Sequence, residues 1–307
     1  MDEARVFAFL ADKQAQGHAC ALVTVLSVEG SSMRNPGTHM GVCEDGSFSG
    51  SLSGGCIENA VVGEALAALG EGAPREVRFG AGSPYLDIKL PCGGALDIHC
   101  QPLAGTAVVN SVLAAIERRK PYTIAVEVDG IRVIDGWQPS DRQFGHWPQL
   151  RLEIVGHGAG VEAVARLARA MQVESHVLTP DVRMLESLRE QAIRATRIDR
   201  TSDTHLLVGD PWTAFVFLFH DHDWEVQLMA RALDLPHFYL GAMGSRKAHA
   251  TRCSALEAAG VRPEAIASIN APIGLFHSSR DPETLALSAL GEIVRAYQQA
   301  DSEVVLG

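Results

Sequence analysis

The sequence lacks three features that would each place the protein in a broad class. It has six cysteines but no pair spaced as CxxC, so neither a zinc ribbon nor a thioredoxin-like site is expected. No apolar run approaches the roughly 20 residues that a membrane-spanning helix requires. Basic residues are outnumbered, with 26 Lys and Arg against 37 Asp and Glu, and the formal net charge is −11. This deficit argues against a nucleic-acid-binding surface, which needs a concentrated basic face.

The N-terminal stretch MDEARVFAFLADKQ is acidic and amphipathic, unlike a secretory signal peptide, so we expect a cytoplasmic protein. Disulfides are rare in that compartment, and the six thiols are expected to be reduced. With 307 residues, of which 47% are hydrophobic, the chain is long enough for two domains with cores of their own. The sequence contains no internal repeat and no low-complexity segment.

The clearest secondary-structure pattern lies near the middle of the chain, over residues 151–181. An apolar strand, a turn with Gly156, Gly158 and Gly160, an amphipathic helix and a second strand follow one another there. Glycine lets the backbone turn sharply and approach a diphosphate, and the helix N-terminus adds free N–H groups. The pattern predicts a dinucleotide-type βαβ unit.

The dinucleotide fingerprint in this unit is incomplete. Val161 takes the third small position of the GxGxxG pattern, and Thr179 stands where an acidic residue commonly holds the ribose hydroxyls. Asp181 follows two residues late. The motif alone therefore leaves nucleotide binding open.

The first half contains a loop of unusual composition over residues 30–40, after a predicted buried strand over 19–28. The loop carries Ser31, Ser32 and Arg34 together with two glycines and a proline. Serine hydroxyls, free amides and a guanidinium suit a phosphate or another oxyanion. A turn that merely contains polar residues is the alternative.

Two cysteines of the first half are flanked by glycines. Cys56 lies in GSLSGGCIEN (50–59), close to the start of a predicted helix whose dipole would stabilise a thiolate. Cys92 lies in PCGG (91–94). Small neighbours leave room for a ligand, so both cysteines are candidate ligands of a metal or of sulfur. The alternative is two small buried residues beneath glycine turns.

Two further candidate sites follow strands of the second half. The apolar strand over 215–219 leads into HDHD (220–223), which could hold a metal or titrate near neutral pH at the carboxyl end of a parallel sheet. Neighbouring side chains on a strand point apart, so a capping cluster for the next helix is the alternative. The turn over 241–247, with one serine and two basic residues, suits either an anion or a helix cap.

Seven segments, taken together and in order, resemble the XdhC/CoxI family, the accessory factors of xanthine dehydrogenase and related molybdenum hydroxylases. They are GSSMRNPGTHM (30–40), GSLSGGCIENAV (50–61), CGGALDI (92–98), IVGHGAG (154–160), FHDHDWEVQLM (219–229), YLGAMGSRKAH (239–249) and APIGLFHSSRDPETLALS (271–288). In the first segment the family pattern GSSPRPPGAKM differs from this chain at Met33, Asn35, Thr38 and His39.

The resemblance implies an α/β fold with two domains. An N-terminal mixed α/β XdhC/CoxI domain is expected over 1–135 and a C-terminal Rossmann-like domain with a doubly wound parallel sheet over 151–307, with the polar stretch 136–150 as a linker. The resemblance also implies binding of the molybdenum cofactor (molybdopterin), its protection during sulfuration by a cysteine desulfurase, and its handover to an apo molybdenum hydroxylase of the xanthine dehydrogenase type. A homodimer, and a nucleotide in the Rossmann-like domain, are further candidates.

On this interpretation the protein is a maturation factor rather than an enzyme, and no catalytic residue is assigned. Cys56 and Cys92 are the candidate metal ligands or sulfur relays, and burial of the cofactor between the domains would keep water from it. Two alternatives stay open: an NAD(P)-binding oxidoreductase that uses the Rossmann-like domain, and a non-catalytic adaptor that docks the desulfurase to the dehydrogenase. The candidate cofactor-binding residues are Ser31, Ser32, Arg34, Ser53, Gly54, Gly55, Cys56, Glu58, Cys92, Gly93, Gly94, Gly156, Gly158, Gly160, His220, Asp221, Gly244, Ser245, Arg246 and Lys247.

Overall fold

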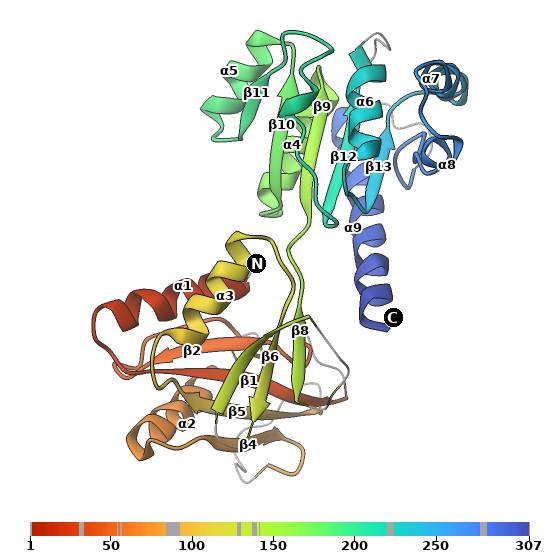
Figure 1. The fold of residues 1–307 in the computed structure, drawn as a ribbon. Coiled ribbons are helices and arrows are strands. Elements are labelled where there is room, and N and C mark those ends of the chain that lie inside the picture. Colours follow the sequence, from red (N-terminus) through yellow and green to blue (C-terminus); the bar gives the residue numbers. More distant parts are fainter. Residues whose placement is uncertain are drawn as a thin grey trace. The chain divides into compact units, whose positions relative to one another are not determined.

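The structure is a computed structural model of the chain (Figure 1). It describes residues 2–30, 34–53, 55, 57–83, 93–127, 130–136, 140, 142–219, 224–276 and 281–306. The chain divides into two compact units, Met1–Pro148 and Gln149–Gly307. Within the described residues, no helix is both long and apolar enough to cross a bilayer.

The first unit is built on an antiparallel sheet of five strands in the order β3-β2-β1-β5-β4. Its central strand, β1, carries apolar side chains on both faces over most of its length because it serves two cores. Ala21, Val23 and Val25 join the core that α2 covers, whereas Cys20 and Leu22 join the core with α1 and α3. The strands are β1 (Cys20–Glu29), β2 (His39–Cys43), β3 (Phe48–Ser49), β4 (Arg75–Gly80) and β5 (Ala95–Pro102), and the helices are α1 (Asp2–Ala15), α2 (Glu58–Glu71) and α3 (Ala107–Glu117).

A second, three-stranded antiparallel sheet completes the first unit in the order β7-β6-β8. Its strands are β6 (Tyr122–Glu127), β7 (Gly130–Asp135) and β8 (Gln143–His146). Residues 143–146 were predicted to lie in a linker, but they pair with β6, with Tyr122 opposite His146. The polar stretch 136–150 therefore includes an edge strand that supplies His146 to the first unit.

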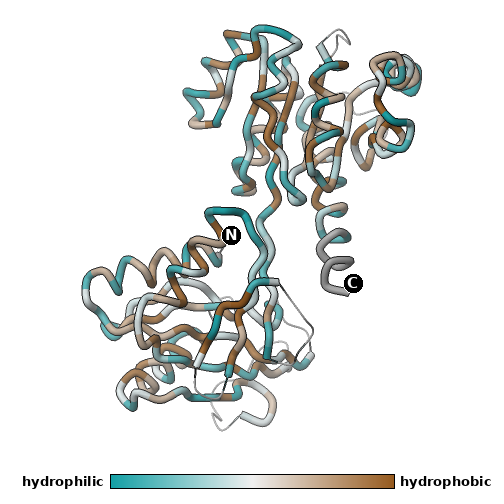
Figure 2. The backbone as a smooth tube through the Cα atoms, in the orientation of Figure 1, coloured by the Kyte–Doolittle hydropathy of each residue, from teal (hydrophilic) through white to brown (hydrophobic). Residues whose placement is uncertain are grey.

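The second unit contains a parallel sheet of five strands in the order β11-β10-β9-β12-β13. Side chains of α4, α5 and α9 pack in the core on one face, and those of α6, α7 and α8 pack on the other. This arrangement confirms the expected doubly wound, Rossmann-like fold. In Figure 2 the hydrophobic colour follows the strands at the centre of this unit, as expected for a sheet covered on both faces. The strands are β9 (Arg151–Gly156), β10 (Glu174–Thr179), β11 (Ala195–Arg197), β12 (Thr213–Leu218) and β13 (Tyr239–Ala242), and the helices are α4 (Ala159–Ala170), α5 (Val182–Glu190), η1 (Thr204–Leu206), α6 (Glu225–Asp234), α7 (Arg246–Ala258), α8 (Pro263–Ala267) and α9 (Pro282–Leu306).

Four of the six cysteines belong to the described residues, and all four are free. Cys20, Cys43 and Cys100 are buried in the first unit, and Cys253 is partly buried in the second. Burial raises the pKa of Cys20 and of Cys100 to about 12. These two thiols are therefore protonated and packed as small apolar residues.

Candidate functional site

Three predicted site loops of the first unit, over 30–40, 91–94 and 50–59, leave the same end of its five-stranded sheet, and the first of them contacts each of the other two. The loop after β1 starts at Gly30, and a Cβ added there would lie 3.2 Å from Gly94 Cα. Strand register also places the second loop, PCGG (91–94), beside the end of β1. Ala95, the first residue of β5, pairs with Glu29, the last residue of β1. The third loop leaves β3 through Gly50, where an added Cβ would lie 2.8 Å from the carbonyl oxygen of His39. The first and second loops thus adjoin at the end of β1, whereas the third leaves the sheet beside the start of β2, where His39 pairs with Thr24 in the middle of β1.

Only part of the predicted site in the first unit belongs to the described residues. Arg34, Ser53, Gly55, Glu58, Gly93 and Gly94 are described. Ser31, Ser32, Gly54, Cys56 and Cys92 lie outside the described residues, and their roles as cofactor or metal ligands stay predictions.

The carboxylate of Glu58 organises the third loop. Its Oε1 accepts hydrogen bonds from Ser51 Oγ at 2.7 Å and from the backbone N–H groups of Leu52 and Ser53 at 3.1 and 3.0 Å. Its Oε2 accepts from Ser53 Oγ at 2.9 Å and from Ile57 N at 3.2 Å. The side chain that the sequence analysis offered as a cofactor ligand therefore holds the turn that leads into α2.

The electrostatics of Glu58 follow from these contacts. Burial alone would raise the pKa of the carboxyl group, but the hydrogen bonds from the Ser53 backbone and from the Ser51 and Ser53 hydroxyls outweigh it and lower the pKa to about 2. Glu58 is therefore ionised at any ordinary pH, and the loop is built around a fixed negative charge.

Replacing Glu58 with Gln is expected to destabilise the first unit by about 2 kcal/mol at neutral pH, because the amide cannot accept all of these charge-assisted bonds. The folded pKa lies below the usual value of 4.5, so the stabilisation from ionised Glu58 is present above pH 4.5 and is lost as the pH falls toward 2. Urea unfolding measured across this range should show a shallower loss of stability in Glu58→Gln than in the wild type. Glu117→Gln, at an exposed position of the same unit, is the matched control. Parallel pH curves for Glu58→Gln and the wild type would contradict the prediction.

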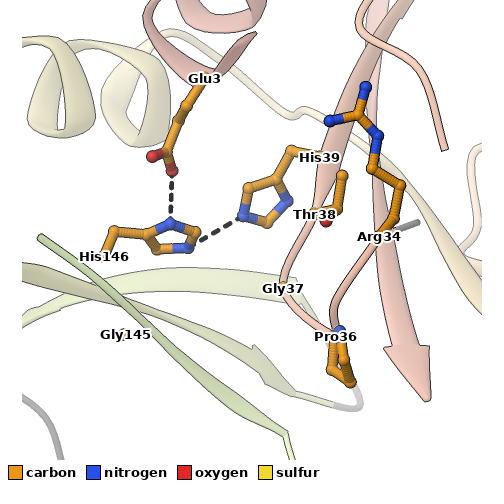
Figure 3. A pocket seen from close by; sticks show the side chains of 8 residues that line it. All are labelled: Glu3, Arg34, Pro36, Gly37, Thr38, His39, Gly145 and His146. Carbon is orange, nitrogen blue, oxygen red and sulfur yellow. Dashed lines mark hydrogen bonds and ion pairs between the residues drawn. The ribbon is translucent and has the colours of Figure 1, made fainter. Parts of the chain in front are cut away.

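A pocket of about 470 Å³ opens beside the first loop (Figure 3). Gly37 brings this loop against β8, since a Cβ added to Gly37 would lie 2.9 Å from Phe144 Cβ. The pocket therefore combines side chains from the loop, from α1 and from both sheets. Its lining residues are Glu3, Arg34, Pro36, Gly37, Thr38, His39, Gly145 and His146.

A chain of polar contacts runs through one wall of this pocket. Nε2 of His39 lies 3.1 Å from Nε2 of His146, and Nδ1 of His146 lies 2.6 Å from Oε1 of Glu3 (Figure 3). At the other end, Nδ1 of His39 lies 3.0 Å from the hydroxyl oxygen of Thr24. Both imidazoles thus have their Nδ1 atoms occupied by oxygen partners and their Nε2 atoms directed at each other.

Burial sets the charges in this chain of contacts. It lowers the pKa of His39 to about 3, with a further lowering from the neighbouring His146 that outweighs the opposite effect of Glu3. For Glu3, burial would raise the pKa, but the contacts with His146 and the nearby His39 lower it to about 2. At neutral pH the wall therefore presents a neutral His39 and an ionised Glu3 on either side of His146.

Glu3, His39 and His146 were not among the residues selected from sequence. Among the described residues they form the one group of three or more His, Cys, Asp or Glu side chains whose ligand atoms all lie close enough to share a metal ion. His39 belongs to the first loop segment, so its neighbourhood was selected, but nothing local connects it to α1 or β8. The pocket's cationic residue, Arg34, was predicted to bind the cofactor, and its position in the lining is compatible with an anionic ligand there.

In the second unit the three glycines of the βαβ turn have different surroundings. A Cβ on Gly156 would lie 2.5 Å from the carbonyl oxygen of Leu218, so this glycine lets β9 and β12 approach. A Cβ on Gly160 would lie 3.2 Å from Cδ2 of Leu285 in α9. Gly158 precedes α4 with φ of +90°, and a Cβ there would meet no atom within 4 Å. Gly158 is therefore the member of this turn with free space beside it.

Two polar residues of the predicted turns in the second unit, Asp181 and Ser245, serve as helix caps. Asp181 accepts hydrogen bonds from the N–H groups of Arg183 and Met184 at 2.9 and 3.1 Å, so it caps α5. Ser245 accepts from the Ala248 N–H at 3.2 Å and caps α7, with Arg246 and Lys247 exposed beside it. The cap that the sequence analysis offered as the alternative at 241–247 is thus present. His220 and Asp221 lie outside the described residues.

Comparisons with known proteins cover both units. A model described as the XdhC Rossmann domain matches residues 152–293, and a model described as the XdhC and CoxI family matches residues 13–80. The chain is 34% identical over 312 residues to the molybdenum cofactor insertion chaperone PaoD of Escherichia coli (strain K12), with 98% of this chain and 91% of that protein covered. It is 23% identical to the uncharacterized protein YqeB of the same organism, of which it spans 48%. A crystal structure described as a xanthine dehydrogenase from Bacillus halodurans has the same fold, with a TM-score of 0.75, 20% identity, and coverage of 97% of this chain and 96% of that chain.

Proposed function

Because this chain belongs to the XdhC and CoxI family, we propose that it is a chaperone that binds the molybdenum cofactor and delivers it to an apoenzyme. The similar PaoD carries the description of an insertion chaperone for that cofactor, and the similarity spans nearly the whole of both chains. The proposal goes further than the relative's description: the protein supports sulfuration of the bound cofactor by a cysteine desulfurase and hands it to a molybdenum hydroxylase of the xanthine dehydrogenase type.

The observation that supports this proposal is that the predicted site loops leave the same end of the first unit's sheet, with Gly30 beside Gly94 at the end of β1. The cofactor is a pterin with a phosphate tail and a metal held by a dithiolene. Gly30 and Gly94 are in close contact there and carry no side chains, so backbone amides can approach a ligand. Arg34 lines the adjacent pocket and offers a guanidinium for the phosphate. The residues present therefore fit an anionic ligand with a bulky body.

Each residue set has a separate proposed task. Arg34 and the glycine backbone hold the phosphate tail, and Glu58 keeps the loop before α2 in one conformation through its hydrogen bonds. Cys56 and Cys92 are proposed to lie near the metal or to relay sulfur. When bound, the cofactor supplies the metal centre that the recipient enzyme needs, and the chaperone's residues bind it, orient it and keep water away.

The proposal is tested by cofactor binding to the purified protein. Arg34→Ala is expected to weaken binding of the molybdenum cofactor by about 10- to 100-fold, the loss of one charge-assisted contact. Cys56→Ala combined with Cys92→Ala is expected to reduce maturation of an apo xanthine dehydrogenase by the chaperone. Binding is measured by pterin fluorescence after gel filtration, and maturation by recovered dehydrogenase activity. Arg118→Ala, at an exposed position of the same unit, is the control. Absence of cofactor binding by the wild type, or full maturation by the double cysteine variant, would overturn the respective part of the proposal.

The oxidoreductase alternative has less support from the second unit. The acid nearest to the usual ribose-binding position, Asp181, is engaged as the cap of α5, and Thr179 at the strand end is buried. Gly158 retains open space at the start of α4, where a nucleotide would have to lie. Isothermal titration calorimetry with NAD and NADP separates this alternative from the chaperone proposal, because only the oxidoreductase requires a nicotinamide nucleotide to bind. The adaptor alternative predicts partner binding without any small-molecule ligand.

A further inference from the structure

The two histidines of the pocket wall have the arrangement of metal ligands held by outer partners. In protein metal sites, one ring nitrogen of a histidine binds the ion and the other donates to a carboxylate or another oxygen, which fixes the ring orientation. Here Nδ1 of His146 lies 2.6 Å from Glu3, and Nδ1 of His39 lies 3.0 Å from Thr24 Oγ1. The two remaining nitrogens, both Nε2, lie 3.1 Å apart. From this geometry we propose that His39 and His146 bind a divalent transition-metal ion of the zinc class through their Nε2 atoms.

The separation of the two nitrogens suits such an ion. Zinc–nitrogen bonds of about 2.0–2.1 Å at a tetrahedral angle place two nitrogen ligands roughly 3.3 Å apart. The observed 3.1 Å is close to that value, and ion binding requires both rings to tilt so that their Nε2 lone pairs converge on the ion instead of facing each other. Imidazole nitrogens favour Zn²⁺, Co²⁺, Ni²⁺ or Cu²⁺ over Mg²⁺ and Ca²⁺, which prefer oxygen. The donor set therefore selects the chemical class of the ion.

The rings are held in place by packing as well as by hydrogen bonds. Tyr122 stacks on His146 with ring centroids 5.0 Å apart and planes inclined by 19°. Phe7 contacts the ring of His39 edge-on at 5.9 Å. His39 begins β2 and His146 ends β8, so both positions belong to paired strands. A pre-positioned pair of ligands loses little conformational freedom when it binds an ion.

The site opens into the pocket, which distinguishes it from a closed structural site. Two protein nitrogens leave coordination positions free, and the pocket of about 470 Å³ gives room for water or an exogenous ligand at those positions. Arg34 lines the same pocket and would favour an anionic ligand on the metal. Glu3 is available as the outer carboxylate or, after a side-chain rotation, as a third ligand, since its oxygen lies within 4.8 Å of the other ligand atoms.

The test uses the full-length protein, purified with a chelator and free of molybdenum cofactor. Isothermal titration with Zn²⁺ is expected to show saturable binding of one equivalent that His39→Gln or His146→Gln weakens by more than tenfold. Glu3→Gln, which removes the outer carboxylate, is expected to weaken binding by about 10- to 100-fold. Titration with Co²⁺, followed by its visible absorption, reports the ligand geometry independently, and the bands should be lost in His39→Gln.

Two controls separate this site from others in the chain. His18 lies 3.0 Å from Glu44 and is exposed in the same unit. His18→Gln therefore removes a comparable His–Glu pair and should leave the affinity for Zn²⁺ unaltered. The titration is repeated in a Cys56→Ala, Cys92→Ala background, which removes any zinc that these thiols bind and keeps the outcome independent of the proposed cofactor site. The fold of each variant is checked by circular dichroism, and if His39→Gln does not fold, His146→Gln and Glu3→Gln decide. Zn²⁺ binding that is absent in the wild type, or that persists in both His146→Gln and Glu3→Gln, overturns the proposal in favour of a purely hydrogen-bonded pair.

Discussion

Replacing Glu225 with Ala is expected to lower the free energy of unfolding of the second unit by about 3–5 kcal/mol, because it leaves a buried guanidinium without its counter-charge. Glu225 and Arg252 are both 1% exposed. Arg252 donates from Nε to Oε2 at 3.0 Å and from Nη2 to Oε1 at 3.2 Å, which joins α7 to the start of α6. The same guanidinium donates from Nη2 to the carbonyl oxygen of Met243 at 2.7 Å. The pair therefore also holds the turn that precedes α7.

The measurement is urea unfolding with hydrogen exchange resolved to peptides of residues 149–307. The matched control is Asp199→Ala, which removes an ion pair of the same kind at the surface: Arg197 Nε and Asp199 Oδ1 lie 2.9 Å apart, but the side chains are 53% and 63% exposed. Water screens such a pair, so the control should cost less than about 1 kcal/mol. The double variant Glu225→Leu with Arg252→Met removes both charges and should recover much of the loss. A loss below about 1 kcal/mol in Glu225→Ala would show that the guanidinium stays hydrated.

Replacing Gly156 with Ala is expected to destabilise the second unit by about 3 kcal/mol, the sum of overpacking and backbone strain. An added Cβ would lie 2.5 Å from the carbonyl oxygen of Leu218 and 2.7 Å from its carbonyl carbon. Both atoms are backbone of the adjacent strand β12, which pairs with β9 at this position and cannot move without disturbing the sheet. The φ angle of +156° is also unfavourable for a residue with a side chain.

Gly160→Ala is the matched control in the same turn. Its Cβ would lie 3.2 Å from Cδ2 of Leu285, the flexible end of a side chain, and the residue lies within α4. The gain in helix propensity of about 1 kcal/mol offsets this contact, so the variant should be close to the wild type in stability. The free energies of unfolding of both variants, measured with a chemical denaturant, show whether strand packing is the reason that position 156 requires glycine. If Gly156→Ala is as stable as Gly160→Ala, the close approach of β9 and β12 does not require glycine.

The sequence interpretation succeeded where the signal is local. Alternating contacts of β1 with two cores explain a run of apolar residues that is recognisable as a buried strand. Ser245 and the residues after it were recognised as a possible helix start, and the hydroxyl caps α7. The edge strand β8 was missed because four residues in a polar stretch, with glycine among them, show little periodicity. Missing β8 removed His146 from the candidate residues.

Two residues that were predicted to bind a ligand make structural contacts within the protein instead. Glu58 was predicted to be a cofactor-binding residue, whereas its carboxylate accepts hydrogen bonds from the loop's own backbone and hydroxyl groups. Gly156 was selected as part of a phosphate-binding turn, whereas its neighbour is the backbone of β12. A glycine pattern cannot distinguish close approach to a ligand from close approach to another strand, since both need the absence of a Cβ.

The sequence alone determined that the chain is an α/β protein of the XdhC and CoxI family, with a Rossmann-like second half and glycine-rich loops in the first. Periodicity, turn residues and helix caps are properties of neighbouring residues, and they can be recognised along the chain. The tertiary structure alone decided that Glu3, His39 and His146 share one wall of a pocket. His39 and His146 are 107 residues apart, and they meet because β8 pairs with β6 and Gly37 lets the first loop pack against Phe144. Such a contact depends on strand pairing and close packing across the whole unit, which no local pattern of residues specifies.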